Sequence, residues 1–307
     1  MNAVLFAYQQ LGYIFLKELL LNGFEVKAVV THADNPSEKI WFPSVEKLAE
    51  SNNIPVFEAG NPKILEEIQK IKPDVIFSAM FRKIIPLEII NFPRLGSFNL
   101  HPSLLPKYRG RCPANWVLVN GEKETGLTIH KMTQTPDAGE ILSQTKIDIS
   151  QDDTIASLYN KFADAAPDLI RQTLEKIKND KINLTPQDEN NASSFGARTP
   201  EDGLFSWNDK AVKIHNLVRA VAHPYPGAFC KDGNKKLFIW RSALSNTDLK
   251  DTKPSQIIST TPLTVATADG ALEIKRLQWE SESEYCAKDF VETYKIKTGD
   301  FITKEIK

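Results

Sequence analysis

The N-terminal third of the chain alternates between two hydrophobic patterns. Short, continuous apolar runs such as AVLFA and DVIFSA are typical of buried strands, whereas LGYIFLKELLLN repeats its apolar residues at the spacing of an amphipathic helix. These patterns predict strands at 3–7, 25–31, 54–57, 74–79 and 96–100 and helices at 11–22, 43–52 and 62–71. Strands that alternate with helices indicate a mostly parallel, Rossmann-like α/β sheet. The first strand-to-helix turn, AYQQLG, lacks the G-x-G-x-x-G fingerprint, which argues against a bound nicotinamide dinucleotide.

The same two patterns continue through the next third of the chain. We expect a helix at 113–121, strands at 126–132 and 140–149, and a long helix that begins after 154 and ends near 179. The segment 181–203 is polar, rich in turn-forming residues and without periodicity, so we place a domain boundary in it.

Beyond this boundary the pattern changes. One amphipathic helix is expected at 209–221, and from 228 onward short strands are separated by turns that contain Gly or Pro. This arrangement favours a small C-terminal β-barrel of the OB type. We therefore expect an α/β domain over 1–190 and a β-barrel domain over 204–307.

The composition is that of an ordinary globular protein, with 41% apolar and 25% charged residues. The 38 basic and 39 acidic residues leave a net charge of -1, which gives no overall attraction to nucleic acid or to an anionic membrane. The three cysteines are widely spaced and form no C-x-x-C pair, which favours a reducing compartment without structural zinc. The N-terminus lacks the pattern of a signal peptide, and no run of about 18 apolar residues is present, so we expect a cytoplasmic protein.

Three polar residues with complementary chemistry, Asn99, His101 and Asp137, lie at or beyond the end of the fifth predicted strand, where open α/β sheets bind ligands. His101 can accept and donate a proton near neutral pH, and a nearby carboxylate such as Asp137 would raise its pKa. Asn99 lies two positions earlier on the same side of the strand and can direct its amide N–H at an oxyanion. The trio fits acyl transfer to an amine, while the alternative is a strand-end histidine beside an unrelated asparagine. His32 and His130 have no metal-ligand spacing, so we assign them no role.

Two other segments leave alternatives open. In SLLPKYRGRCP, either Arg109 or Arg111 holds an anion, or the segment is a solvated basic turn. In HNLVRAVAHPYPGAF, His215 and His223 form either a lip over a substrate or a helix cap and a packed turn. We favour the structural interpretation of these two histidines.

The segment N-L-H-P-S-L-L-P-K-Y-R-G, followed by T-P-D-A-G, resembles the signature of the N10-formyltetrahydrofolate-dependent formyltransferases. Longer segments are similar to the formyltransferase domain of ArnA-type enzymes: THADNPSEK, KYRGRCPANWVLVNGEKETGLTIHKM, and RTPEDGLFSW with VRAVAHPYPGAF. The resemblance covers nearly the whole chain. It implies a formyltransferase domain over 1–190 that takes 10-formyltetrahydrofolate as co-substrate and no metal.

The resemblance also implies roles for individual residues. His101 is the general acid and base, Asn99 stabilises the tetrahedral intermediate, and Asp137 raises the pKa of the histidine. The folate contacts of the family fall on Lys83, Ile84, Ile85, Arg111, Thr133, Gln134, Thr135, Pro136 and Asp137.

For the acceptor, the ArnA-type resemblance implies the primary amine of a nucleotide sugar, UDP-4-amino-4-deoxy-L-arabinose, in lipopolysaccharide and lipid A modification and antibiotic resistance. Two departures leave the sugar open. Pro102 stands where the ArnA-type pattern has Gly, and the chain ends at Lys307 without the NAD-dependent decarboxylase domain. The alternative acceptor is a dTDP-amino-dideoxyhexose.

Other branches of the family share the trio. Methionyl-tRNA formyltransferases also share the C-terminal β-barrel, but that branch of the family looks to carry a basic, glycine-containing insertion after the second strand. This chain has ADNPSEKIWFPS there, with the single lysine Lys39. Because tRNA binding depends on such cations, we expect a small-molecule acceptor and neither nucleic acid nor membrane as a partner. Glycinamide ribonucleotide formyltransferases resemble only the N-terminal part. A folate- or RNA-binding protein is the non-enzymatic alternative, and homo-oligomerisation stays open.

Overall fold

The structure is a computed structural model that describes residues 1–34, 40–247 and 251–303. Lys39 lies outside the described residues. The chain forms two compact units. The N-terminal unit comprises Met1–Pro113, Glu124–Asp148 and Tyr159–Gly196, and the C-terminal unit comprises Ala114–Lys123, Ile149–Leu158 and Ala197–Lys307.

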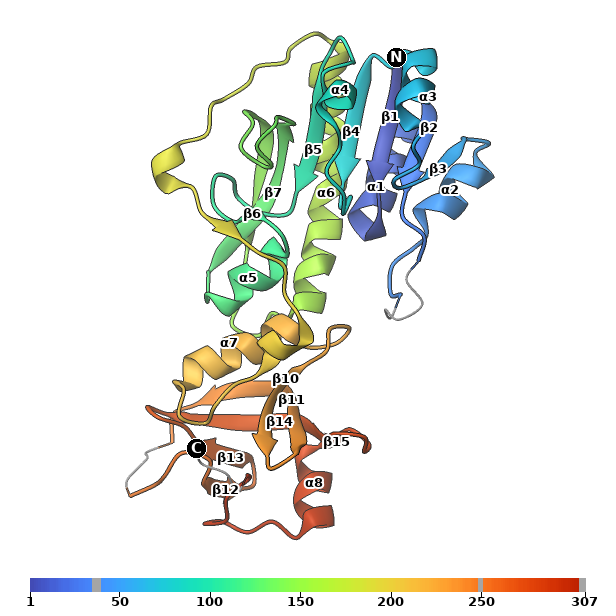
Figure 1. The fold of residues 1–307 in the computed structure, drawn as a ribbon. Helices are drawn as coiled ribbons and strands as arrows, with labels where there is room; N and C mark the ends of the chain where they lie inside the picture. The colour runs from blue at the N-terminus through green and yellow to red at the C-terminus, as the bar shows by residue number, and fades with distance from the viewer. Residues whose placement is uncertain (35–39, 248–250, 304–307) are drawn as a thin grey trace. The chain divides into compact units, whose positions relative to one another are not determined.

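The N-terminal unit contains one seven-stranded sheet (Figure 1). Its strands are β1 (Asn2–Ala7), β2 (Glu25–Thr31), β3 (Val56–Glu58), β4 (Val75–Ala79), β5 (Ser97–His101), β7 (Glu124–Lys131) and β8 (Ile141–Asp148). The α-helices before residue 196 are α1 (Gln9–Leu21), α2 (Val45–Ser51), α3 (Ile64–Ile71), α4 (Leu87–Ile90), α5 (Pro113–Val119) and α6 (Ile155–Lys178). The residues of α5 and of α6 are divided between the two units. The strand order is β3-β2-β1-β4-β5-β7-β8, parallel as far as β5 and antiparallel beyond it.

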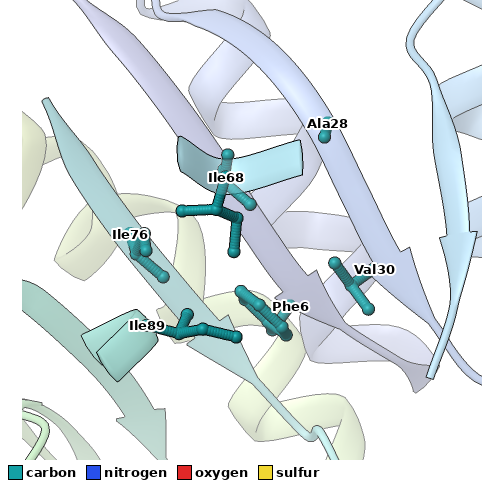
Figure 2. Close-up of a cluster of buried hydrophobic side chains, with 7 residues drawn as sticks. Phe6, Ala28, Val30, Ile68, Ile76 and Ile89 are labelled. Carbon is teal, nitrogen blue, oxygen red and sulfur yellow. The ribbon is translucent and has the colours of Figure 1, made fainter. Parts of the chain in front are cut away.

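Apolar side chains cover both faces of this sheet. On one face, α3 and α4 pack against β1, β2 and β4 in the cluster drawn in Figure 2, with Phe6, Ala28, Val30, Ile68, Ile76 and Ile89 labelled. On the other face, Phe15 of α1 lies against Phe77, with ring centroids 4.9 Å apart. Ile76 and Phe77 are neighbours in β4 and so point to opposite faces. Burial on both faces explains why these strands are continuous apolar runs in the sequence.

The predicted fold class is confirmed, and every strand and helix expected before residue 181 is present with ends that differ by a few residues. Three short elements were not expected: α4, and the parallel pair of β6 (Arg109–Gly110) with β9 (Ser194–Phe195). Each is too short to show a period in the sequence. β9 lies in the polar segment 181–203, which also holds the 3-10 turns η1 (Glu189–Asn191) and η2 (Pro200–Gly203).

The C-terminal unit is built on a six-stranded sheet. Its elements are α7 (Ala211–Val221), β10 (Ala228–Asp232), β11 (Lys235–Ser245), β12 (Ile257–Thr260), β13 (Leu263–Ala266), β14 (Ala271–Trp279), β15 (Tyr285–Cys286) and α8 (Ala287–Tyr294). The strands pair antiparallel in the order β10-β11-β14-β13-β12, with β15 on β14. Among the described residues of this unit, no strand pairing joins β10 to β12. Where a β-barrel was expected, the structure has an antiparallel sheet in this strand order. Helix α8 was not expected.

Within the described ranges, no helix combines the length and the apolar character that are needed to cross a membrane.

Candidate active site

Two neighbouring strands and one loop bring the predicted polar residues together. Asn99 and His101 are alternate residues of β5 and point to the same face of the sheet. β7 runs antiparallel beside β5 and places His130 opposite Asn99. The loop between β7 and β8 carries Asp137, whose Oδ1 lies 3.5 Å from Nδ1 of His101 and 3.4 Å from Nε2 of His130. The trio expected from the sequence therefore gathers at one place, and His130 joins it.

His130 is a site residue that the sequence analysis missed. Its side chain is 2% exposed, and its Nδ1 lies 2.9 Å from the carbonyl oxygen of Lys131, which can only accept, so Nδ1 carries the proton. In the neutral imidazole, Nε2 is then unprotonated and accepts a hydrogen bond of 3.2 Å from Nδ2 of Asn99. His130 thus orients the Asn99 amide and leaves the second N–H of that amide available. The sequence placed His130 in a predicted strand at 126–132, but it did not show that this strand pairs with β5 or which residue lies opposite Asn99.

His101 is buried, with 5% of its side chain exposed. Its Nε2 donates to the carbonyl oxygen of Tyr108 at 2.8 Å, so Nδ1, which faces Asp137, is the nitrogen that gains or loses a proton. Burial lowers the pKa of His101, and the charge of Asp137 and the Tyr108 carbonyl raise it by less. The expected effect of Asp137 on the histidine pKa is present, but the net shift is downward because desolvation is larger.

Asp137 is held as an anion in a strained backbone conformation. Its Oδ2 accepts a hydrogen bond of 2.8 Å from the backbone N–H of Gly110, and its side chain is 12% exposed. Burial raises the pKa of this carboxyl, but His101 and His130 in their protonated forms and the Gly110 N–H lower it by more, so the pKa is well below its usual range. Asp137 has a φ of +58°, in the left-handed region that residues with a Cβ seldom adopt. Such strain is common where a loop carries chemistry.

The loop between β5 and α5, which supplies the Gly110 N–H, is fixed by a distant segment. Its short strand β6 pairs with β9. Gly110 has a φ of +92°, and a Cβ at this position would lie 2.3 Å from the carbonyl oxygen of Phe195, so only glycine fits. The ring of Tyr108 stacks on that of Phe195, with centroids 4.9 Å apart. The loop is therefore rigid because β9 holds it, and not only because of its own prolines.

The two arginines of this loop have different environments. The guanidinium of Arg109 is buried and donates to both carboxylate oxygens of Glu189, at 2.9 and 2.7 Å, and to Oε1 of Gln187. Arg109 therefore belongs to the structure of the loop: its guanidinium holds a carboxylate of this chain, and it is not part of a solvated basic turn. Arg111 is exposed, and its place among the folate contacts stays a prediction.

The other predicted folate contacts lie in two loops. Lys83, Ile84 and Ile85 follow β4, which pairs with β5, so this loop begins beside the end of β5. Ile84 is 78% exposed, whereas Ile85 packs against the core cluster of Figure 2. Residues 133–136 are exposed in the loop that carries Asp137. The structure brings only Asp137 of this set into contact with the histidines, and the remaining contacts stay predictions.

His215 and His223 make structural contacts within the C-terminal unit. Nδ1 of His215 lies 3.0 Å from Oγ of Ser242, and the ring of His223 stacks on Trp240 with centroids 3.7 Å apart. The contact of His223 agrees with a packed turn, whereas His215 lies inside α7, whose N-cap is Lys210, and so has a structural contact without being a helix cap. In the ranges 1–34, 40–247 and 251–303, no group of three or more His, Cys, Asp or Glu side chains has the arrangement of a metal site.

Comparison with known protein families gives a match in each unit. Residues 10–174 match the family described as Formyl transferase, and residues 198–295 match the family described as Formyl transferase, C-terminal domain. The first match alone spans more than half of the chain.

Several solved structures resemble this chain. The N-formyltransferase from Helicobacter canadensis, solved with folinic acid and dTDP-3-aminofucose, is 23% identical, with 92% of this chain and 99% of that chain covered and a TM-score of 0.68. HypX from Aquifex aeolicus in complex with tetrahydrofolic acid is 19% identical, with 99% and 49% covered and a TM-score of 0.65, so this chain spans about half the length of HypX. Methionyl-tRNA formyltransferase from Clostridium thermocellum is 20% identical, with 81% and 95% covered and a TM-score of 0.56. At these identities the likeness establishes a common fold, and it is the family match over residues 10–174 that shows this chain to belong to the formyl transferase family.

Proposed function

We propose that the protein is an N-formyltransferase that moves the formyl group of 10-formyltetrahydrofolate to the primary amine of a nucleotide-linked amino sugar. The observation that carries this proposal is the meeting of Asn99, His101 and Asp137 at the end of β5. These residues supply an oxyanion donor, a proton carrier and a carboxylate, which formyl transfer to an amine requires. We propose residues 1–190 as the catalytic domain and residues 204–307 as the C-terminal β domain.

The loops next to the trio fit a folate donor. Ile84 exposes an apolar side chain in the loop after β4, and a flat pterin ring is a ligand that would cover such a side chain. The exposed residues 133–136 offer backbone groups of the kind that hydrogen-bond to a pterin edge. Two proteins of the same fold were solved with folates, which supports the same donor here. We propose Lys83, Ile85 and Arg111 as further donor contacts.

The site geometry suggests an order of steps. The lowered pKa of His101 leaves its imidazole neutral, so its Nδ1 can take the proton that the acceptor amine loses as it attacks the formyl carbon. The free N–H of the Asn99 amide donates to the resulting oxyanion, since its other N–H is used by His130. The bond between the formyl carbon and N10 then breaks, and His101 gives its proton to N10. Asp137, 3.5 Å away, stabilises the charged imidazole between these steps.

For the acceptor we propose UDP-4-amino-4-deoxy-L-arabinose, in lipopolysaccharide and lipid A modification linked to antibiotic resistance. The ArnA-type similarity of KYRGRCPANWVLVNGEKETGLTIHKM supports this choice. A dTDP-amino-dideoxyhexose is the second candidate, because the structure from Helicobacter canadensis, 99% of which is covered, was solved with dTDP-3-aminofucose. The three free cysteines, Cys112, Cys230 and Cys286, support action in the reducing cytoplasm.

The test is an assay with 10-formyltetrahydrofolate and one acceptor at a time: UDP-4-amino-4-deoxy-L-arabinose, dTDP-amino sugars, or charged initiator tRNA. Formylation of the UDP sugar supports the proposal, and formylation of a dTDP sugar alone would replace the acceptor. Formylation of tRNA alone would refute the sugar assignment, and no turnover with any amine would favour a folate-binding protein. His101→Ala should lower the rate by roughly 10²- to 10⁴-fold, and unchanged turnover would rule out its role.

A further inference from the structure

The polar segment after α6 is tied to the catalytic loops at both of its ends. This segment, residues 185–195, is drawn in yellow in Figure 1. At its start, Thr185 and Ile141 exchange backbone hydrogen bonds at the beginning of β8. At its end, β9 pairs with β6 in the loop that supplies the Gly110 N–H. The segment therefore contacts both loops that meet at Asp137.

Gln187, near the middle of this segment, links the two loops through its side-chain amide. Its Nε2 donates to the carbonyl oxygens of Asp137 and Gly139, at 2.8 and 2.6 Å. Its Oε1 accepts from Nε and Nη2 of Arg109, at 3.1 and 2.8 Å. Carbonyl oxygens only accept and a guanidinium only donates, so the orientation of the Gln187 amide is determined by its partners. Glu189 holds Arg109 from the other side with two further hydrogen bonds.

These contacts bear directly on how Asp137 faces His101. Asp137 has a positive φ, so its loop needs contacts that keep the backbone in this conformation. The Gly110 N–H holds the carboxylate of Asp137, and Gln187 holds the backbone carbonyl groups on either side of Ala138. Without Gln187, those two carbonyl oxygens lose their side-chain donor and the loop can shift.

We propose that Gln187 is a positioning residue that keeps the carboxylate of Asp137 in place beside His101. The inference rests on the proposed function, because it assigns Gln187 to the proton transfer that the trio performs. Gln187 does not touch the reacting atoms. It acts through the backbone of the loop 132–140, with Arg109 and Glu189 as its anchor.

Two substitutions separate this role from a general contribution to folding. Gln187→Glu keeps the acceptor for Arg109 and adds a charge that attracts it, but it replaces the donor to Asp137 and Gly139 by an oxygen. Gln187→Leu removes both halves of the interaction. Asn191→Ala is the control, because Asn191 lies in the same segment and its amide hydrogen-bonds only to Asp188 among the described contacts.

The readouts are kcat, the titration of His101 by NMR with His101→Ala as the assignment standard, and hydrogen exchange of the peptide 132–140. In both Gln187 variants we expect kcat to fall by roughly 10- to 100-fold, since small misplacements in a site have effects of this size. We also expect exchange of 132–140 to be about tenfold faster, from the loss of two hydrogen bonds, and His101 to titrate at lower pH. Asn191→Ala should match the wild type in all three.

A Gln187→Glu variant with wild-type kcat, exchange and His101 titration would overturn the proposal and leave Gln187 as an anchor for Arg109 only. Equal effects in Gln187→Glu and Asn191→Ala would also overturn it. If the wild-type protein formylated no amine, the proposed function would fail, but the exchange and titration measurements would still decide whether Gln187 positions Asp137.

Discussion

Replacing the charge of Asp137 while keeping its shape gives a direct test of the site. In Asp137→Asn, the side-chain oxygen can still accept from the Gly110 N–H, so the loop is held and mainly the charge is lost. The carboxylate oxygen lies 3.5 Å from Nδ1 of His101. At an effective permittivity near 20, two unit charges at this distance attract by about 5 kcal/mol. Opposite charges this close shift a measured pKa by about 1–3 units, or roughly 1.4–4 kcal/mol.

The consequence for the rate follows from the imidazolium that forms when neutral His101 takes the proton of the amine. Without the charge of Asp137, this imidazolium is less stable by roughly 1.4–4 kcal/mol, so the proton transfers that pass through it should slow by roughly 10- to 10³-fold. The assay is kcat at saturating donor and acceptor, together with the NMR titration of His101. Asp168→Asn, which removes an exposed carboxylate on α6, is the control and should leave both quantities unchanged. An Asp137→Asn enzyme within about threefold of the wild-type kcat, or with unchanged His101 titration, would refute this electrostatic role.

Three other variants test the surroundings of the trio. His130→Leu should lower kcat by roughly tenfold or more because the Asn99 amide loses the partner that orients it. His130→Gln should recover part of this loss in the same assay, and equal losses in the two variants would contradict the orienting role of His130. Gly110→Ala places a Cβ against the carbonyl oxygen of Phe195, at a residue with a left-handed backbone conformation, and should cause strain of about 1–3 kcal/mol. Calorimetry should show an unfolding midpoint lower by several degrees, and an unchanged midpoint would contradict the predicted strain. Burial and two neighbouring cations lower the pKa of His32 to about 4. The unfolded chain therefore binds this proton first, so His32 should make the wild-type protein less stable as the pH falls from about 6.5 towards 4 and should contribute no pH dependence above 6.5. Urea unfolding across this range should show a smaller loss in His32→Gln, and an identical pH dependence would exclude His32 as the cause.

The hydrophobic pattern was sufficient to predict the N-terminal sheet for a physical reason. Both faces of its central strands are buried, as Ile76 and Phe77 illustrate, so each strand is a continuous apolar run with turns on either side. The amphipathic helices that cover the sheet have the period of 3.6 residues. Elements that lack such a signal were missed. α4 has four residues, and β6 and β9 have two each, so their formation depends on tertiary contacts alone.

The site was predictable only where its residues are close in the sequence or belong to a recognised motif. Asn99 and His101 share a strand, and Asp137 follows in a motif that resembles the formyltransferase signature. His130 joins the site through the register of β5 with β7, which the sequence does not reveal. Gln187 contacts Asp137 across 50 positions of the chain, from a polar segment with no periodic pattern.

The dependence of the active-site loops on residues 185–195 sets a lower limit on the length of a working fragment. The family match ends at residue 174, and the last helix of the N-terminal unit ends at Lys178. A fragment cut after that helix would contain every strand of the sheet and the whole trio. It would lack Gln187, Glu189 and β9, so the backbone carbonyl groups of the Asp137 loop would lose their side-chain donor and β6 would lose its paired strand. During synthesis, the site can therefore be completed only after the chain has grown past Phe195, well after its catalytic residues have been made.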